Sequence, residues 1–213
     1  MKVGSVKEIK NNEYRVGMTP DNVRSYTQAG HQVLIEDGAG IGSGFTTAEF
    51  EAAGAKILPS AKEVWQGADM IIKVKEPLKE EYQYFREDLI LYTYLHLAAD
   101  RPLTDAMLAS GIHGVAYETL METNGSLPLL APMSQIAGRL SIQEGAKYLE
   151  KPFGGSGVLL SGVPGTPQAK VLILGAGVVG TNACKVAVGM GADVTMMDLN
   201  LERLAYLDDI FGA

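Results

Sequence analysis

Short apolar runs alternate along this chain with longer stretches that have the periodicity and the end signals of helices. The runs that predict buried strands in the first part lie at residues 2–6, 33–36, 70–74, 89–92 and 115–117. Thr19-Pro20 predicts the start of a helix that ends near residue 29, and Thr46 and Ser60, each three residues before a glutamate, predict two more. This alternation predicts a parallel α/β sheet with both faces covered.

Two segments interrupt the alternation. Residues 37–44 are too rich in glycine to predict either helix or strand, and two prolines bound residues 128–132. A long helix is expected after the second segment, at about residues 133–149. We therefore expect residues 1–130 to form a doubly wound parallel-sheet substrate domain, and residues 131–213 to hold a linker helix and an incomplete Rossmann dinucleotide-binding domain.

The most specific motif of the chain is a glycine turn. An apolar run directly precedes Gly175, Gly177 and Gly180, which have the G-x-G-x-x-G spacing of dinucleotide-binding turns. The first glycine permits a tight turn, the second lets a pyrophosphate approach the backbone, and the third lets the next helix pack on the strand. We predict a dinucleotide site here; the alternative is a structural turn that binds nothing.

The residues after this turn predict which dinucleotide binds. A second apolar run, at residues 194–197, ends in Asp198, where a carboxylate accepts the hydroxyls of the adenosine ribose. A carboxylate there repels a 2′-phosphate, and no arginine follows until Arg203, so NAD is predicted over NADP. Asn200 then predicts the start of another helix. A complete dinucleotide fold has two βαβαβ halves, so we expect a chain truncated at its C-terminus.

The composition excludes several classes of function. The net charge of −7 argues against a nucleic-acid partner, because binding to phosphates requires a basic face. Three histidines and one cysteine are too few for a structural metal cluster, so no metal is expected, and Cys184 is interpreted as a core thiol. We find neither a signal peptide nor an apolar run long enough to span a bilayer, and expect a soluble cytoplasmic protein with no membrane partner.

Four side chains of the first part, those of Arg15, Lys73, Lys75 and His96, suit chemistry on a small acid. Arg15 can bind both oxygens of a carboxylate, although a solvated surface arginine is the alternative. Lys73 and Lys75 alternate along a strand expected to run up to Pro77, so both are expected on one side of it, with Lys75 projecting into a cleft. His96 stands at an expected strand end, where α/β proteins place ligands. An acid/base group and a core histidine are equally good interpretations of His96 from its position alone.

Six segments together resemble the alanine dehydrogenase family. They are RVGMTP from residue 15, KVKEP from residue 73, LHLA from residue 95, MSQIAGR from residue 133, GVLL from residue 157 and GAGVVG from residue 175. The resemblance runs through the whole chain in order. This family shares its fold with the NAD-binding component of proton-translocating transhydrogenase.

The resemblance implies a reversible reaction of L-alanine with NAD that gives pyruvate and ammonia, in a homo-oligomer that is a hexamer. It implies Arg15 and Lys75 as contacts of the substrate carboxylate and carbonyl, and His96 as the general acid/base. The implied cofactor contacts, besides the three glycines, are Ser134, Val178, Val179, Asp198 and Arg203. Ser134 could instead cap the linker helix.

The second catalytic group of the family, an aspartate, has no counterpart in this chain. Two alternatives therefore stay open beside alanine dehydrogenase. One is the NAD-binding domain of a transhydrogenase, and the other is a non-catalytic fragment.

Overall fold

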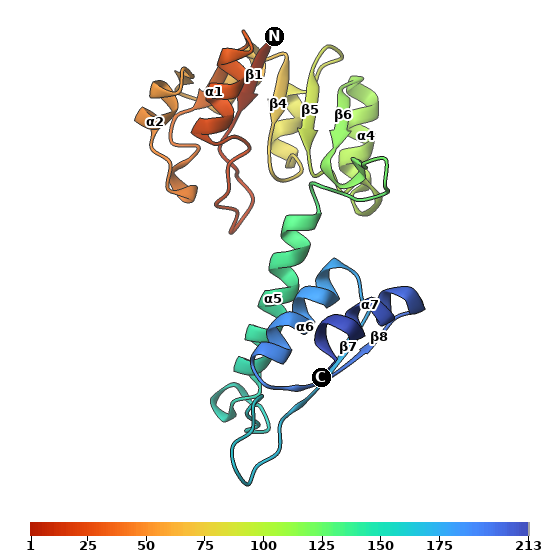
Figure 1. Cartoon of the computed structure of the whole chain (residues 1–213). Coiled ribbons are helices and arrows are strands. Elements are labelled where there is room, and N and C mark those ends of the chain that lie inside the picture. The colour runs from red at the N-terminus through yellow and green to blue at the C-terminus, as the bar shows by residue number, and fades with distance from the viewer. Residues whose placement is uncertain (213) are drawn as a thin grey trace. The chain divides into compact units, whose positions relative to one another are not determined.

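Six parallel strands form a single sheet in the first part of the chain, in the order β3-β2-β1-β4-β5-β6 (Figure 1). Their bounds are β1 Lys2–Ser5, β2 Gln32–Glu36, β3 Lys56–Leu58, β4 Met70–Ile72, β5 Ile90–Thr93 and β6 His113–Ala116. The strand order reverses between β1 and β4. In doubly wound sheets ligands bind outside the carboxyl ends of the strands at such a reversal.

The computed structural model describes residues 1–212, and these fall into two units, Met1–Leu120 and the part that begins at Met121. The domain boundary near residue 130 stays a prediction. Among the described residues, no helix is both long and apolar enough to cross a membrane.

Local side-chain caps explain where the helices of the first unit begin. Thr19 precedes α1 (Pro20–Gln28) and Thr46 precedes α2 (Thr47–Ala52), each in a reciprocal capping box with the residue three positions later. The Ser60 hydroxyl accepts the Glu63 N–H at the start of α3 (Ala61–Gly67). These three starts agree with the prediction.

One helix of this unit, α4 (Arg101–Ser110), was not predicted, although Asp100 caps it and a proline follows in its first turn. The glycine-rich segment contains a short 3-10 helix, η1 (Ile41–Ser43), where no helix was expected. Three further 3-10 helices lie in this unit: η2 Lys79–Tyr84, η3 Leu97–Ala99 and η4 Tyr117–Thr119.

The core of the first unit consists of two apolar clusters. One contains Trp65 of α3 and Leu103 of α4, and the other contains Val23 of α1 and Phe50 of α2. Since strand residues contribute to both clusters, helices cover both faces of the sheet. The predicted α/β class is therefore confirmed.

One strand is shorter than predicted. β4 ends at Ile72, so Lys73 and Lys75 lie in the loop that follows it. The prediction that both lysines share one side of a strand was wrong: the Lys73 N–H still donates to the Tyr92 carbonyl oxygen of β5, but the strand ends before both lysines.

The second unit holds two parallel strands, β7 (Lys170–Leu174) and β8 (Asp193–Met197), joined by α6 (Val178–Gly189). It also contains α5 (Ala131–Tyr148), η5 (Lys151–Phe153) and α7 (Leu201–Phe211). Cys184 is buried in its core, as predicted. Strand, glycine turn, helix and strand follow in the order that the sequence predicts for the first part of a Rossmann domain.

Helices α5 and α6 approach each other closely at Gly138. A Cβ at this position would collide with the Val179 carbonyl oxygen and press on the Asn182 side chain. The neighbouring Arg139 Nε donates to Asn182 Oδ1 at 3.1 Å. The contact between the two helices therefore depends on a position without a side chain.

We expect Gly138→Ala to lower the free energy of unfolding of the second unit by about 1–3 kcal/mol, because the added methyl overpacks the contact with α6. Gly145→Ala is the matched control, since Gly145 lies in the same helix and a Cβ there meets no atom within 4 Å. That control should be neutral or gain up to about 1 kcal/mol from helix propensity. Urea unfolding of both variants measures the difference, and equal midpoints would contradict the close approach.

Candidate functional site

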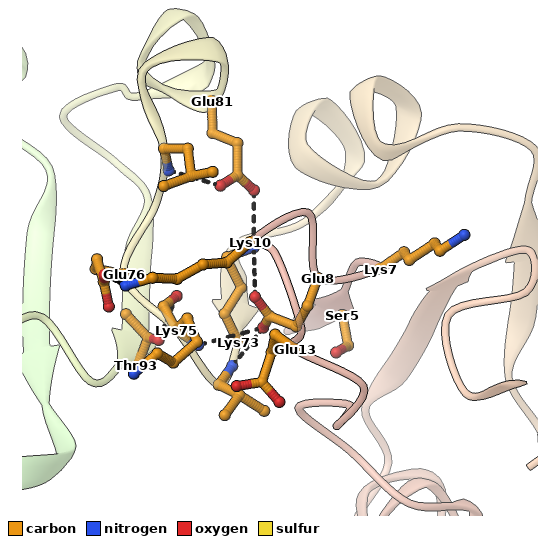
Figure 2. A network of polar contacts seen from close by, with 12 residues as sticks. Ser5, Lys7, Glu8, Lys10, Glu13, Lys73, Lys75, Glu76, Glu81 and Thr93 are labelled. Atoms are coloured by element: carbon orange, nitrogen blue, oxygen red, sulfur yellow. Dashed lines mark hydrogen bonds and ion pairs between the residues drawn. The ribbon is translucent and has the colours of Figure 1, made fainter. Parts of the chain in front are cut away.

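Lys73 is a fully buried lysine, only 1% exposed, immediately after β4. Its Nζ lies 2.8 Å from Glu81 Oε1 and 3.3 Å from Glu8 Oε2 (Figure 2). The two carboxylates come from η2 and from the loop after β1. This buried triple of one ammonium and two carboxylates therefore ties three separate segments together.

Backbone groups complete the triple. The N–H groups of Val74 and Lys75 donate to Glu8 Oε1 at 2.6 and 3.4 Å, and the Leu78 N–H donates to Glu81 Oε2 at 2.9 Å. Burial raises the pKa of Glu8, while Lys73 and the Val74 N–H partly offset that effect. Burial thus makes the charged form of Glu8 unfavourable at neutral pH. This free-energy penalty is relieved as pH falls through the raised pKa of Glu8.

The main chain of Lys75 is hydrogen-bonded next to the triple of Lys73, Glu8 and Glu81. Besides the Glu8 contact to its N–H, its carbonyl oxygen accepts the Thr93 hydroxyl from β5 at 2.9 Å. Its side chain is half-buried, and its positive charge lowers the pKa values of both Glu13 and Glu76. Lys75 therefore lies between the Glu76 carboxylate of its own loop and the Glu13 carboxylate of the loop after β1.

Arg15 forms a two-bond pair with Glu13, two residues earlier in the loop after β1. Its Nε and Nη2 donate to Glu13 Oε1 and Oε2 at 2.8 and 2.7 Å. These hydrogen bonds, ahead of every other cause, lower the pKa of Glu13. Arg15 also interacts electrostatically with Tyr94. The guanidinium is thus presented to a carboxylate in the geometry that Arg favours.

His96 follows β5 in a left-handed backbone conformation, with φ of 51°. Glu118 supports this conformation, because its Oε1 accepts the N–H of His96 at 2.7 Å and that of Leu95 at 3.1 Å. The ring Nδ1 lies 3.2 Å from Glu76 Oε2, and the side chain is 48% exposed. This exposure excludes the interpretation of His96 as a core histidine.

The three site residues predicted from the sequence in this unit all follow strands at the carboxyl end of the sheet. Arg15, Lys75 and His96 follow β1, β4 and β5, which are neighbours in the sheet on either side of the reversal. Electrostatic contacts link them through Glu13 and Glu76.

Sequence reasoning missed the carboxylates between these residues. They are Glu8, Glu13, Glu76, Glu81 and Glu118, all within the loops and short 3-10 helices that follow strands. Their position after apolar runs was the available signal, but the partners of Glu8, Glu76 and Glu118 lie 20 or more residues away in the sequence.

In the second unit the three glycines have different structural reasons. Gly175 has φ of 102°, which favours glycine, and a Cβ at Gly180 would collide with the Gly175 carbonyl oxygen. A Cβ at Gly177, by contrast, would meet no atom within 4 Å. The fold thus requires the first and third glycines, while the second leaves open space above the start of α6.

A cavity of about 540 Å³ adjoins this turn. Its lining includes every predicted cofactor contact of the turn and helix start, and Ser134 from α5: Ser134, Gly175, Gly177, Val178, Val179 and Gly180. Ser134 lies inside α5, whose N-cap is Leu130, so the alternative that Ser134 caps this helix was wrong. The open space, the free helix start and the nearby carboxylate fit a dinucleotide.

Asp198 and Arg203 both hold the turn itself. Asp198 Oδ2 accepts the Ala176 N–H at 2.6 Å, while Arg203 Nε donates to the Ala176 carbonyl oxygen at 3.0 Å and Nη2 to the Thr181 hydroxyl at 2.9 Å. The backbone N–H groups of Ala176 and Asn200 lower the pKa of Asp198. Asp198 is therefore ionised at neutral pH, and its hold on the turn is lost only as pH falls through that lowered pKa. Among residues 1–212, no group of histidine, cysteine and acidic side chains could hold a metal ion.

Comparison with family models matches nearly the whole chain. Residues 4–137 match the alanine dehydrogenase/PNT N-terminal domain, and residues 141–213 match the alanine dehydrogenase/PNT C-terminal domain. An alanine dehydrogenase from Methanococcus maripaludis is 62% identical over 212 residues, which cover 100% of this chain and 57% of that protein. The chain thus spans little more than half the length of this curated relative.

Solved structures give the same picture. An L-alanine dehydrogenase superimposes with a TM-score of 0.93 at 55% identity, covering 100% of this chain and 59% of that one. A transhydrogenase from Sinorhizobium meliloti superimposes with a TM-score of 0.81 at 27% identity, covering 97% of this chain and 62% of the other.

Lys73→Met should destabilise the first unit strongly, by about 3–5 kcal/mol, because it leaves two buried carboxylates without their cation. Lys79→Met, at an exposed lysine of η2, is the control and should change the stability by less than about 0.5 kcal/mol. Adding Glu8→Gln and Glu81→Gln to Lys73→Met should restore part of the loss. Urea midpoints measure all three, and a Lys73→Met midpoint equal to that of the control would show that the triple contributes nothing.

Proposed function

This chain belongs to the alanine dehydrogenase/PNT family, and from that premise we propose that it provides the substrate site and part of the cofactor site of an NAD-dependent alanine dehydrogenase. The substrates are L-alanine in one direction, and pyruvate with ammonia in the other. One observation carries the proposal: Arg15, Lys75 and His96 follow three neighbouring strands at the reversal of strand order, where doubly wound sheets bind ligands.

Each of these side chains has a role that its surroundings support. The Arg15 guanidinium, already paired with the Glu13 carboxylate, binds the substrate carboxylate. The N–H and the carbonyl oxygen of Lys75 are both held by hydrogen bonds, and its ammonium group donates to the substrate carbonyl oxygen. The half-exposed His96 ring passes protons as ammonia adds to pyruvate and water leaves. When bound, the cofactor supplies or accepts the hydride at the α-carbon.

The second unit holds the cofactor through the turn and its surroundings. The start of α6, at Gly177, would bind the phosphates. Ser134 and Val179 line the adjoining cavity. Ionised Asp198 would accept the ribose hydroxyls. Arg203 Nε and Nη2 already donate to the Ala176 carbonyl oxygen and the Thr181 hydroxyl, which leaves less of the guanidinium for a 2′-phosphate. These features favour NAD over NADP.

The higher identity to alanine dehydrogenases, 62% against 27% for the transhydrogenase structure, favours this function over that of a transhydrogenase component. The family resemblance further supports a homo-oligomer, a hexamer, in the cytoplasm.

The activity is tested with a chimera in which residues 1–213 are joined to the remaining part of the Methanococcus maripaludis relative. We expect L-alanine-dependent formation of NADH by the chimera, and little or none by the 213-residue chain alone.

His96→Ala in the chimera should lower kcat about 10²- to 10⁴-fold with a small change in KM. His113→Ala, at an exposed histidine of β6, should leave turnover unchanged. Equal kcat values for the two variants would exclude the role of His96, and a chimera without alanine-dependent turnover would exclude the function.

The glycines allow cofactor binding to be separated from folding. Gly177→Ala should leave the urea midpoint of the 213-residue chain unchanged and weaken NAD binding by the chimera about tenfold or more, since its methyl enters the space proposed for the pyrophosphate. Gly180→Ala should lower the midpoint as well, because its methyl collides with the turn. Unchanged NAD affinity of the Gly177 variant would place the cofactor elsewhere.

A further inference from the structure

Glu76 presents a buried carboxylate oxygen to the His96 ring. Its Oε2 accepts no hydrogen bond from any of the residues that the structure describes, and it lies 3.2 Å from His96 Nδ1. The Glu76 side chain is only 11% exposed, whereas that of His96 is 48% exposed. The exposed ring is therefore freer to move than the buried carboxylate, and its Nδ1 already lies within hydrogen-bonding distance of this oxygen.

The carboxylate is held in its charged form. Its other oxygen is paired with the Lys10 ammonium, which reaches across from the loop after β1 (Figure 2). Burial raises the pKa of Glu76, but the hydrogen bond from Lys10 and the charges of Lys10 and Lys75 outweigh it, so the net pKa is lowered. Glu76 is thus an acceptor at neutral pH, with no proton of its own to donate.

A pure acceptor beside one ring nitrogen selects the tautomer of a neutral imidazole. Only the form with the proton on Nδ1 can donate to Glu76, and the form with the proton on Nε2 would place two acceptors against each other. Carboxylates fix histidine rings in this way in many catalytic and metal sites.

We propose that Glu76 is a positioning residue for His96: its carboxylate holds the ring with Nδ1 protonated and leaves Nε2 as the nitrogen that exchanges protons with the substrate. The part about the substrate rests on the proposed function, but the tautomer does not. Two carboxylates then position His96: Glu118 stabilises its left-handed backbone, and Glu76 orients its ring.

The tautomer is measured directly on the 213-residue chain with ¹⁵N-labelled histidine. Long-range ¹H–¹⁵N correlation spectra, recorded well above the usual histidine pKa of about 6.5, distinguish a protonated Nδ1 from a protonated Nε2. The chain has three histidines, and His96→Ala identifies the signals of His96. We expect the Nδ1-protonated form of His96 to exceed the other form several-fold.

Glu76→Gln should abolish or reverse this excess, because an amide can donate as well as accept, and Glu76→Asp should restore part of it. Glu80→Gln, the same substitution at an exposed glutamate of η2, should leave it unchanged. A wild-type ring protonated mainly on Nε2 would overturn the proposal even if the Glu76 variants failed to fold. An Nδ1 excess that survives Glu76→Gln would equally overturn it.

The proposed function is tested separately by the turnover of the chimera. An Nδ1-protonated ring in an inactive chimera would support the role of Glu76 and refute the alanine dehydrogenase activity. An active chimera with the opposite tautomer would do the reverse.

Discussion

The burial of one lysine ammonium fixes the edge of the sheet on which the proposed substrate site is built. A buried charge is costly unless it is paired and its partners are fully hydrogen-bonded. Lys73 meets this condition with Glu8 and Glu81, whose remaining oxygens accept backbone N–H groups. Because every member needs the others, the segments that carry them cannot shift independently. Arg15 and Lys75 belong to two of these segments and are thereby placed relative to each other.

Outside this triple the cations of the charge pairs lie closer to water. Arg15 is paired with Glu13 of its own loop, and Lys10 bridges to Glu76. A substrate carboxylate must therefore share or compete for the Arg15 guanidinium with Glu13, which is a requirement for charge and shape together. The inner triple gives rigidity, and each outer pair joins a partly exposed cation, Lys10 or Arg15, to a largely buried carboxylate. Such a division suits a site that binds small charged molecules and releases them.

The sequence predicted most of the elements, although not β3 or α4, and it predicted the partners of buried charges poorly. Caps such as Thr19 and Thr46 act within three residues, so their helices were predicted from local patterns. The end of β4 was misplaced because the apolar pattern continues to Val74 although the strand ends at Ile72. The pairing of Lys73 with Glu8, 65 positions earlier in the chain, is contained in no local pattern. His96 was predicted from its position at a strand end, whereas its neighbours Glu76 and Glu118 were missed for the same reason of distance in sequence.

The glycine turn shows why a motif residue can serve the fold and the ligand together. Asp198, assigned by its position to the ribose, accepts the Ala176 N–H, and Arg203 donates to the carbonyl oxygen of the same peptide residue. A substitution at Asp198 would therefore loosen the turn and, if the proposed function holds, also alter the choice between NAD and NADP. Gly177 is different, because its missing side chain relieves no contact within the protein. An effect of Gly177 on binding without an effect on stability thus isolates the contribution of the ligand, which Asp198 alone cannot do.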